Sequence, residues 1–305
     1  TSAASTQAAL NHKPLTSLNM SPDRHLCESV QAPGPSVFPE LAMLALRTAS
    51  IDPDAQGRRL AQARIAGNLA DVDLSSVMTL EDAEDVSDAT VRALGWAQIG
   101  YALVGTHPAV ARTLRLGGPV VGPLLREAIL DDGGTLRLPR GALGASVGLT
   151  FMIGRSFPFT DEEAPTARNA LGACAACRLD LHIVGRRTAL PTVLDERAAT
   201  ADLGLEVAHV AGPWIDGWMS ADIAAGEASL AIDGNVVARG HGRDVMGDPL
   251  NAVAWLARHL ADRGSGLNGG DLVSVGSCCG LAQVLPGQIL TARLGGLGPI
   301  SLRLC

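Results

Sequence analysis

The spacing of the apolar residues changes near residue 134, and this change limits the folds that the chain can adopt. Before it, apolar residues recur at helical spacing, and Pro53 and Thr79 stand where helices begin. After it, short apolar runs alternate with turns rich in Gly, Asn and Asp, which is typical of strands. Helices first and strands later favour an α+β fold over alternating βαβ units.

Local signals place the individual elements. We expect a helix from Pro53 to about Leu69 and a second from an N-cap at Thr79 to Leu94. The Thr160-x-x-Glu163 capping box predicts a helix that ends near Cys177, so that Cys174-x-x-Cys177 lies in an Ala-rich helix. Further predictions are a helix over 250–261 and strands over 149–153, 181–184, 230–232, 236–238, 272–275, 289–294 and 300–304, with an Asp233-Gly234 hairpin turn.

The same reading divides the chain into three parts. Residues 1–38 are rich in Ser, Thr, Ala and Pro without periodicity, and we expect a disordered tail there. Residues 39–134 form an N-terminal helical subdomain, and residues 135–305 form the strand-rich domain.

Composition excludes some classes of function. The net charge is −7 and the pI is about 5.5, which argues against nucleic acid as a partner. No run is long enough to span a membrane, so we expect a cytoplasmic protein. Lys13 is the one lysine of the chain, so lysine chemistry has no candidate in the folded part.

Three segments of the C-terminal half resemble a known enzyme family. They are Gly-Arg-Asp-Val-Met-Gly-Asp-Pro at 242–249, Gly-Ser-Cys-Cys-Gly at 276–280 and Gly-Gly-Leu-Gly at 295–298. Their order resembles the 2-keto-4-pentenoate hydratase branch of the fumarylacetoacetate hydrolase superfamily. The resemblance implies a mixed β-roll with an N-terminal helical part, a small-molecule substrate and a homo-oligomer.

The resemblance also implies a magnesium site that this chain lacks. The family holds its divalent metal with a Glu-x-Glu pair on one strand and a third Glu on a later strand. Alignment puts Ser146 and Gly148 at the pair and His182 at the third position, and a hard cation prefers oxygen ligands. The active-site lysine of the family becomes Gln98. We therefore expect no metal and no other cofactor.

Seven residues are the candidates for the site. His182 alternates with Leu181 and Ile183, so its side chain points into the former metal cavity, and an imidazole can transfer protons near neutral pH. Asp202 and Glu206 are the candidate helpers in catalysis. The candidate substrate-binding residues are Gln98, Ser146, Ser277 and Cys278.

Purely structural roles for these residues stay open. His182 can be a buried histidine with a polar neighbour, Asp202 a loop cap and Glu206 a surface residue. Asp180 shares the face of His182 and can orient it. Glu206-x-x-His209 resembles a zinc pair only if it is helical, and the segment reads as loop then strand.

Three functions fit these residues. The first is a metal-independent enzyme that performs acid–base chemistry, such as isomerisation, cyclisation or dehydration, on an enolisable carbonyl compound. The second is a catalytically silent subunit that binds a partner enzyme. The third is a metal-dependent 2-oxo acid hydratase or decarboxylase, whose ligands would be Glu162, Glu163, Asp180 and Glu206.

Overall fold

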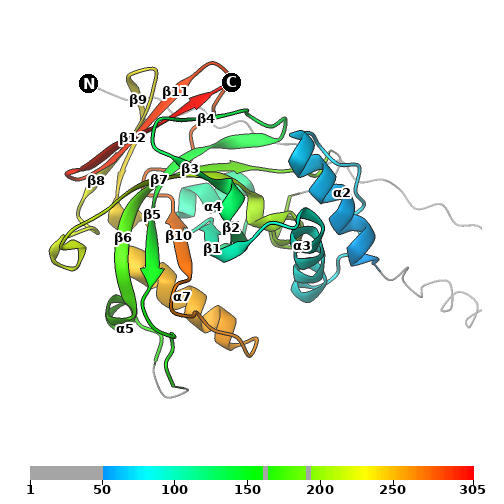
Figure 1. Cartoon of the computed structure of the whole chain (residues 1–305), viewed down its shortest axis with the longest axis horizontal. Helices are drawn as coiled ribbons and strands as arrows, with labels where there is room; N and C mark the ends of the chain where they lie inside the picture. The colour runs from blue at the N-terminus through cyan, green and yellow to red at the C-terminus, as the bar shows by residue number, and fades with distance from the viewer. Residues whose placement is uncertain (1–50, 161–163, 190–193) are drawn as a thin grey trace, which may run out of the picture. The chain divides into compact units, whose positions relative to one another are not determined.

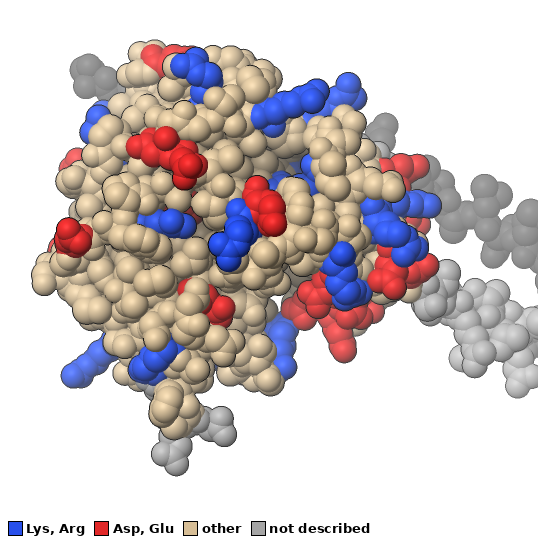
Figure 2. Space-filling view, viewed as in Figure 1, with Lys and Arg blue, Asp and Glu red and all other residues tan. Residues whose placement is uncertain are grey.

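The computed structural model describes residues 51–160, 164–189 and 194–305, which lie within one compact unit, residues 48–305. The expected tail over 1–38 lies outside the described residues. Within the described ranges, no helix is long and apolar enough to cross a bilayer. On the face drawn in Figure 2, acidic and basic side chains are interspersed rather than separated by sign.

In the part of the chain that the structure describes, two helices precede the sheets, as predicted. Helix α2 (Pro53–Ala66) begins after Asp52, whose carboxylate accepts a hydrogen bond from the Ala55 amide at 2.9 Å. Helix α3 (Leu80–Leu94) begins with a capping box between Thr79 and Asp82. The helices pack closely because Gly57 has no side chain, and a Cβ there would lie 2.6 Å from the Ala89 backbone.

A seven-stranded sheet forms the centre of the described structure (Figure 1). In spatial order its strands are β2 (Val120–Leu125), β1 (Gln98–Val104), β10 (Leu272–Gly276), β5 (Ala142–Ile153), β6 (Cys174–Gly185), β7 (Glu206–Trp214) and β3 (Ile129–Asp131). The pairs β1–β10 and β3–β7 are parallel, and the other pairs are antiparallel. Strands β1, β2 and β3 belong to this sheet although they precede residue 135, in the part of the chain that was predicted to be helical.

A five-stranded sheet lies beside the first. Its strands, in spatial order, are β4 (Gly134–Leu136), β12 (Leu297–Leu304), β11 (Ile289–Leu294), β8 (Glu227–Ile232) and β9 (Asn235–His241). Strands β8 and β9 form the predicted hairpin, since Asp233 and Gly234 both have positive φ, at 49° and 81°.

The apolar face of the seven-stranded sheet holds the main core. Leu149, Leu181 and Ile183 from this face join side chains of the second sheet and of helices α5 (Ala167–Ala173) and α7 (Pro249–Ala261) in one buried cluster. Alternation along β6 therefore sends Leu181 and Ile183 to the core and His182 to the opposite face, as the sequence predicts.

The opposite face is the concave inside of a roll. Val104 of β1, Val120 of β2 and Val184 of β6 meet in one apolar cluster, although β10 and β5 separate β1 from β6 in the sheet. Helices α4 (Pro108–Leu114) and α6 (Glu196–Ala201) contribute to the same cluster. The short 3₁₀ turn η2 (Leu203–Leu205) contacts β2 and leads into β7.

One predicted element is wrong. Helix α5 ends at Ala173, and Cys174 and Cys177 lie in strand β6 instead of a helix. The Ala-rich run has helical propensity, but β6 pairs with β5 and β7 on its two sides and buries both thiols. This tertiary pairing overrides a weak local preference. Glu163 of the predicted capping box lies outside the described residues.

Candidate functional site

A group of polar side chains is buried on the concave face of the roll. It comprises Ser146, Thr150, Asp180, His182, Glu206, His209 and Ser274, each of them at most 4% exposed. They come from four neighbouring strands: β5, β6, β7 and β10. Buried polar groups are stabilised only when they are paired, so the contacts within this group determine what it can do.

A β-bulge at Val207 brings Glu206 and His209 to one face. Residues three apart on a regular strand point to opposite faces. Here Ile183 pairs with Ala208 and Val184 pairs with Glu206, so Val207 is an extra residue on β7. The bulge shifts the alternation by one position, and both side chains reach the concave face without a helix.

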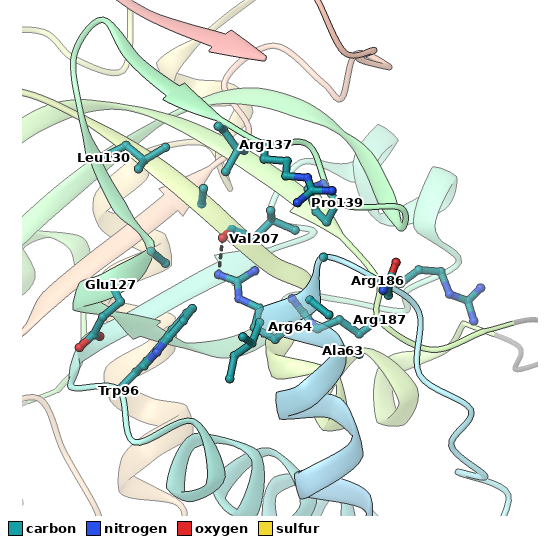
Figure 3. A pocket seen from close by; sticks show the side chains of 17 residues that line it. Ala63, Arg64, Trp96, Glu127, Leu130, Arg137, Pro139, Arg186, Arg187 and Val207 are labelled. Atoms are coloured by element: carbon teal, nitrogen blue, oxygen red, sulfur yellow. Dashed lines mark hydrogen bonds between the residues drawn. The ribbon is translucent and has the colours of Figure 1, made fainter. Parts of the chain in front are cut away.

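Two arginines bind the carbonyl groups at this bulge. Arg64 of α2 donates to the Glu206 carbonyl at 3.0 Å and also to the Val207 carbonyl, a contact drawn in Figure 3. Arg187 donates to the Glu206 carbonyl at 2.5 Å. The guanidinium groups therefore satisfy acceptors that the disrupted ladder leaves open, and they fix the position of Glu206.

A cavity of about 200 Å³ lies beside the bulge (Figure 3). Its lining includes Arg64, Trp96, Arg137 and Val207. The Arg64 guanidinium lies over the Trp96 ring, 5.4 Å from its centroid. Burial, and then the nearby charge of Arg187, lower the pKa of Arg64 to about 9. None of the seven buried polar side chains lines this cavity.

The Glu206 carboxylate contacts both imidazoles. One oxygen makes a short hydrogen bond with Nε2 of His209, and the other lies 2.8 Å from Nε2 of His182. The two rings are stacked, with their centroids 4.3 Å apart and their planes 19° apart. The His182–Glu206 contact is close but lacks hydrogen-bond geometry, so Nε2 of His182 and that Glu206 oxygen have no hydrogen-bond partner.

Asp180 holds the other side of His209. One Asp180 oxygen lies 2.7 Å from Nδ1 of His209, and it accepts hydrogen bonds from Ser274 at 2.5 Å and from Thr150 at 3.1 Å. The sequence suggested Asp180 as the residue that orients His182. The structure pairs it with His209 instead, because His209 lies directly opposite His182 on β7.

The cluster shifts the pKa values of its members strongly. Burial alone would raise the pKa of Asp180 and Glu206, but the neighbouring histidines lower both values to about 2. Burial alone would lower the pKa of His209, but Asp180 and Glu206 raise it to about 10. An imidazolium between two carboxylates is therefore the favoured charge state of the group without a metal.

Asp202 lies in a neighbouring ion pair and not in the cluster. Its carboxylate makes a short contact with the guanidinium of Arg187 and accepts from the Thr188 amide at 3.1 Å. Asp202 is completely buried and Arg187 is 4% exposed. Since Arg187 also binds the Glu206 carbonyl, Asp202 acts on the cluster through the position of the bulge.

The predicted substrate-binding residues lie in different places. Ser146 is 3% exposed and pairs with His182 across β5 and β6. Ser277 donates to the Gly280 carbonyl at 2.6 Å, within its own loop. Cys278 is completely buried, and burial raises the pKa of its thiol well above the usual value. Gln98 is exposed, lines another cavity and donates to the Gly100 carbonyl at 3.1 Å.

The sequence analysis did not predict that His209 lies at the centre of the cluster. The Glu-x-x-His spacing places both side chains on one face only because β7 has a bulge at Val207, and no local signal in the sequence predicts that bulge. Arg187 was missed because an arginine after a strand is common. Of the residues proposed for a metal-dependent hydratase, Asp180 and Glu206 do meet in the cluster, while Glu162 and Glu163 lie outside the described residues.

The aligned positions do not fit a magnesium ion. Ser146 offers one hydroxyl, His182 an imidazole, and Gly148 no side chain. A Cβ at Gly148 would lie 2.6 Å from the Val275 carbonyl of β10, so no carboxylate fits there without a shift of the strand. Magnesium requires near-octahedral oxygen coordination, which these three residues cannot supply.

Comparison with known proteins identifies the family. The model named fumarylacetoacetate (FAA) hydrolase C-terminal matches residues 117–304. The chain belongs to the fumarylacetoacetate hydrolase family. Within the superfamily it groups with hydratases and decarboxylases. It is 28% identical to a 2-keto-4-pentenoate hydratase of Paraburkholderia xenovorans (strain LB400), over 73% of this chain and 83% of that one.

Two further comparisons cover more of the chain. A 2-keto-4-pentenoate hydratase 2 of Dechloromonas aromatica (strain RCB) is 29% identical, over 86% of this chain and 96% of that protein. The chain also superposes on a solved structure, 4-oxalocrotonate decarboxylase from Pseudomonas putida G7 complexed with magnesium and adipate, with a TM-score of 0.74 at 21% identity. The superposition covers 83% of this chain and 97% of that chain. The predicted family-like fold, α+β with an N-terminal helical part, is confirmed.

Proposed function

We propose that this family member is a magnesium-independent enzyme that performs acid–base chemistry on an enolisable carbonyl compound. One observation carries the proposal: a single carboxylate, Glu206, contacts two stacked imidazoles inside the roll. The relatives named hydratase and decarboxylase act, by name, on 2-oxo acids or their enols. Chemistry of this kind moves a proton next to a carbonyl group.

The roles of the residues follow from their contacts. His182 has no hydrogen-bond partner on Nε2, so this nitrogen is available to take a proton from the carbon beside a carbonyl. The C–H electron pair moves into the carbonyl and forms an enolate. Glu206, 2.8 Å away, stabilises the imidazolium that results. Return of the proton to another carbon isomerises the substrate, and protonation of a departing hydroxyl dehydrates it.

The altered metal positions point to the substrate class. Without a Glu-x-Glu pair the roll has no magnesium ion to bind a carboxylate and a ketone together. Neutral or weakly charged ketones are therefore substrates alongside 2-oxo acids. Because every member of the cluster is at most 4% exposed, catalysis requires local opening that admits the substrate.

Exchange of the proton beside the carbonyl tests this function without knowledge of the final product. Protein in EDTA is incubated in D₂O with a panel of 2-oxo acids and neutral ketones, and deuterium uptake is followed by NMR. We expect uptake with at least one substrate and a decrease of roughly 10²–10⁴-fold in His182→Ala, the usual range for a lost general base.

His107→Asn is the matched control for that experiment. His107 caps α4 by accepting from the Ala109 amide at 3.0 Å, and asparagine can also cap a helix. This variant should retain the wild-type exchange rate. Full activity of His182→Ala, or exchange that requires added magnesium, would show that the proposal is wrong.

The burial of the cluster favours a second candidate, a catalytically silent subunit that binds a partner enzyme. In this case the charged cluster only stabilises the inside of the roll. Absence of exchange with every substrate, together with co-purification with an active family member, would support the silent subunit.

A further inference from the structure

We infer that His182, Glu206 and His209 form a binding site for a divalent transition cation of the zinc class. This inference rests on the same cluster as the proposed function, but it concerns the binding of a metal and not turnover. The site differs in ligands and in chemistry from the magnesium site that the aligned positions cannot form.

The donor atoms converge from two strands. One atom from each of the three residues can be chosen so that all lie within 4.8 Å of one another, and all three residues are buried. A tetrahedral zinc ion about 2.1 Å from each donor would hold the donors roughly 3.4 Å apart. The 2.8 Å contact and the 4.8 Å limit lie on either side of that value, so the spacing of the donor atoms is compatible with one shared cation, which would require the stacked rings to turn toward it.

The His182–Glu206 contact supports shared coordination. Nε2 of His182 and one Glu206 oxygen lie 2.8 Å apart, yet neither has a hydrogen-bond partner. Buried nitrogen and oxygen atoms are rarely left without a partner. Two such atoms that approach without hydrogen-bond geometry can both be satisfied by a cation between them.

Asp180 supplies the outer support that metal-binding histidines usually have. It faces Nδ1 of His209 at 2.7 Å, and it is itself held by Ser274 and Thr150. A proton on Nδ1 donated to Asp180 directs the lone pair of Nε2 toward Glu206. Outer carboxylates of this kind orient the ring and increase metal affinity by about 10–100-fold.

The donor set selects the metal. Two imidazoles and one carboxylate suit zinc, cobalt or iron, whereas magnesium prefers oxygen ligands alone. A bound cation would displace the proton shared by His209 and Glu206 and would occupy the lone pair of His182. The metal therefore competes with the proton-transfer chemistry proposed above, and it should inhibit that activity.

Cobalt(II) is the direct probe, because tetrahedral nitrogen and oxygen ligands give it strong visible absorption. Untagged, metal-stripped protein carrying C27S and C305S is titrated with Co²⁺, then with Zn²⁺ and with Mg²⁺. The cysteine substitutions remove the exposed Cys305 and also Cys27, so adventitious thiolate binding is avoided. We expect one equivalent of cobalt, displacement by zinc and no displacement by excess magnesium.

Variants distinguish this site from others. Glu206→Gln preserves shape but removes the anionic ligand, and it should abolish the cobalt spectrum while circular dichroism shows a folded protein. Asp180→Asn retains all three ligands and should weaken binding by about 10–100-fold. Since Asp180 is not itself a ligand of the proposed site, this variant tests the site even if Glu206→Gln does not fold.

The outcomes separate the two proposals. Absence of a tetrahedral cobalt spectrum, or the same affinity in Asp180→Asn, overturns the metal site and leaves deuterium exchange in EDTA as evidence for the function. Exchange that appears only with zinc supports the site but overturns the role of His182 as a free base. Anomalous diffraction at the zinc edge would locate the ion among the three residues.

Discussion

At the scale of single residues, two buried charge systems meet at Glu206. Its carboxylate interacts with His182 and His209 on the concave face, while its backbone carbonyl accepts from Arg64 and Arg187. Asp202 supports this arrangement by neutralising Arg187. The predicted candidates Asp202 and Glu206 thus lie in one connected system, but Asp202 is a positioning residue and Glu206 is a member of the cluster.

Removal of the Asp202 carboxylate should destabilise the protein. Asp202→Ala leaves the buried Arg187 guanidinium without its counter-ion, which typically costs about 3–5 kcal/mol. Urea unfolding should therefore show a large decrease in midpoint. Asp54→Ala is the control, because Asp54 and Arg92 form a pair whose side chains are both 65% exposed, and its loss should change little. Equal effects in the two variants would contradict the ion-pair interpretation.

At the scale of elements, the bulge in β7 and the close contact of β5 with β10 shape the site. The bulge gives Glu206 and His209 a common face, and Gly148 of β5 lets β10 approach. Both features concern the backbone. The close approach of β10 leaves no room for a side chain at position 148, and the bulge brings the Glu206 carboxylate to the same face as His209.

The support of the bulge by Arg64 can be tested alone. Arg64→Met removes the arginine donor of the Val207 carbonyl and one of the two arginine donors of the Glu206 carbonyl, which should lower the free energy of unfolding by about 1–3 kcal/mol. Amide exchange at the start of β7 should also become faster. Arg137→Met is the control, because Arg137 lines the same cavity but is exposed, and it should have little effect. Unchanged exchange in Arg64→Met would rule out the support.

The contact between β5 and β10 predicts opposite effects at two glycines. In Gly148→Ala the new Cβ would lie 2.6 Å from the Val275 carbonyl, and such overpacking should cost about 1–3 kcal/mol. In Gly172→Ala, inside α5, nothing lies within 4 Å of the new Cβ, so the helix should gain about 0.4–1 kcal/mol. Thermal unfolding compares the two directly. A stable Gly148→Ala protein would show that the strands can separate enough for a side chain.

At the scale of the whole molecule, the roll encloses a group of charged side chains next to apolar clusters. Apolar clusters lie on the convex face and at one part of the concave face, and the His–carboxylate cluster fills another part of the concave face. Because the pKa values of Asp180, Glu206 and His209 in this cluster differ from those in the unfolded chain, the free energy of unfolding should depend on pH.

Stability of the metal-free protein should pass through a maximum with pH. Asp180 and Glu206 have pKa values lowered to about 2 from 3.8 and 4.5, so their contribution is present above pH 4.5 and is lost as pH falls toward 2. His209 has a pKa raised to about 10 from 6.5, so its contribution is complete below pH 6.5 and is lost as pH rises toward 10. The melting temperature in EDTA should be highest between these limits.

Glu206→Gln is the reference for the pH profile. Loss of this carboxylate should make the melting temperature fall less steeply at both acid and alkaline pH, because one of the two anions that keep His209 charged is absent. A wild-type profile identical to that of Glu206→Gln would contradict the cluster as the source of the pH dependence.

Much of the fold could be predicted from the sequence because it depends on local patterns. The helix start at Pro53, the cap at Thr79, the Asp233-Gly234 turn and the alternation around His182 depend on a few residues each, and the structure agrees with each of them. The helical interpretation of Cys174 and Cys177 was wrong because strand pairing on both sides decides that segment. Local propensity is weak against such contacts.

The sequence by itself determined the α+β order and the family, since each depends on residue types at fixed spacing. Only the tertiary structure decided which charged groups meet. Asp180, Glu206 and His209 come together because neighbouring strands bring their side chains onto one concave face and one extra residue in β7 changes the alternation. Such a register depends on hydrogen bonds between distant segments, which no local pattern contains.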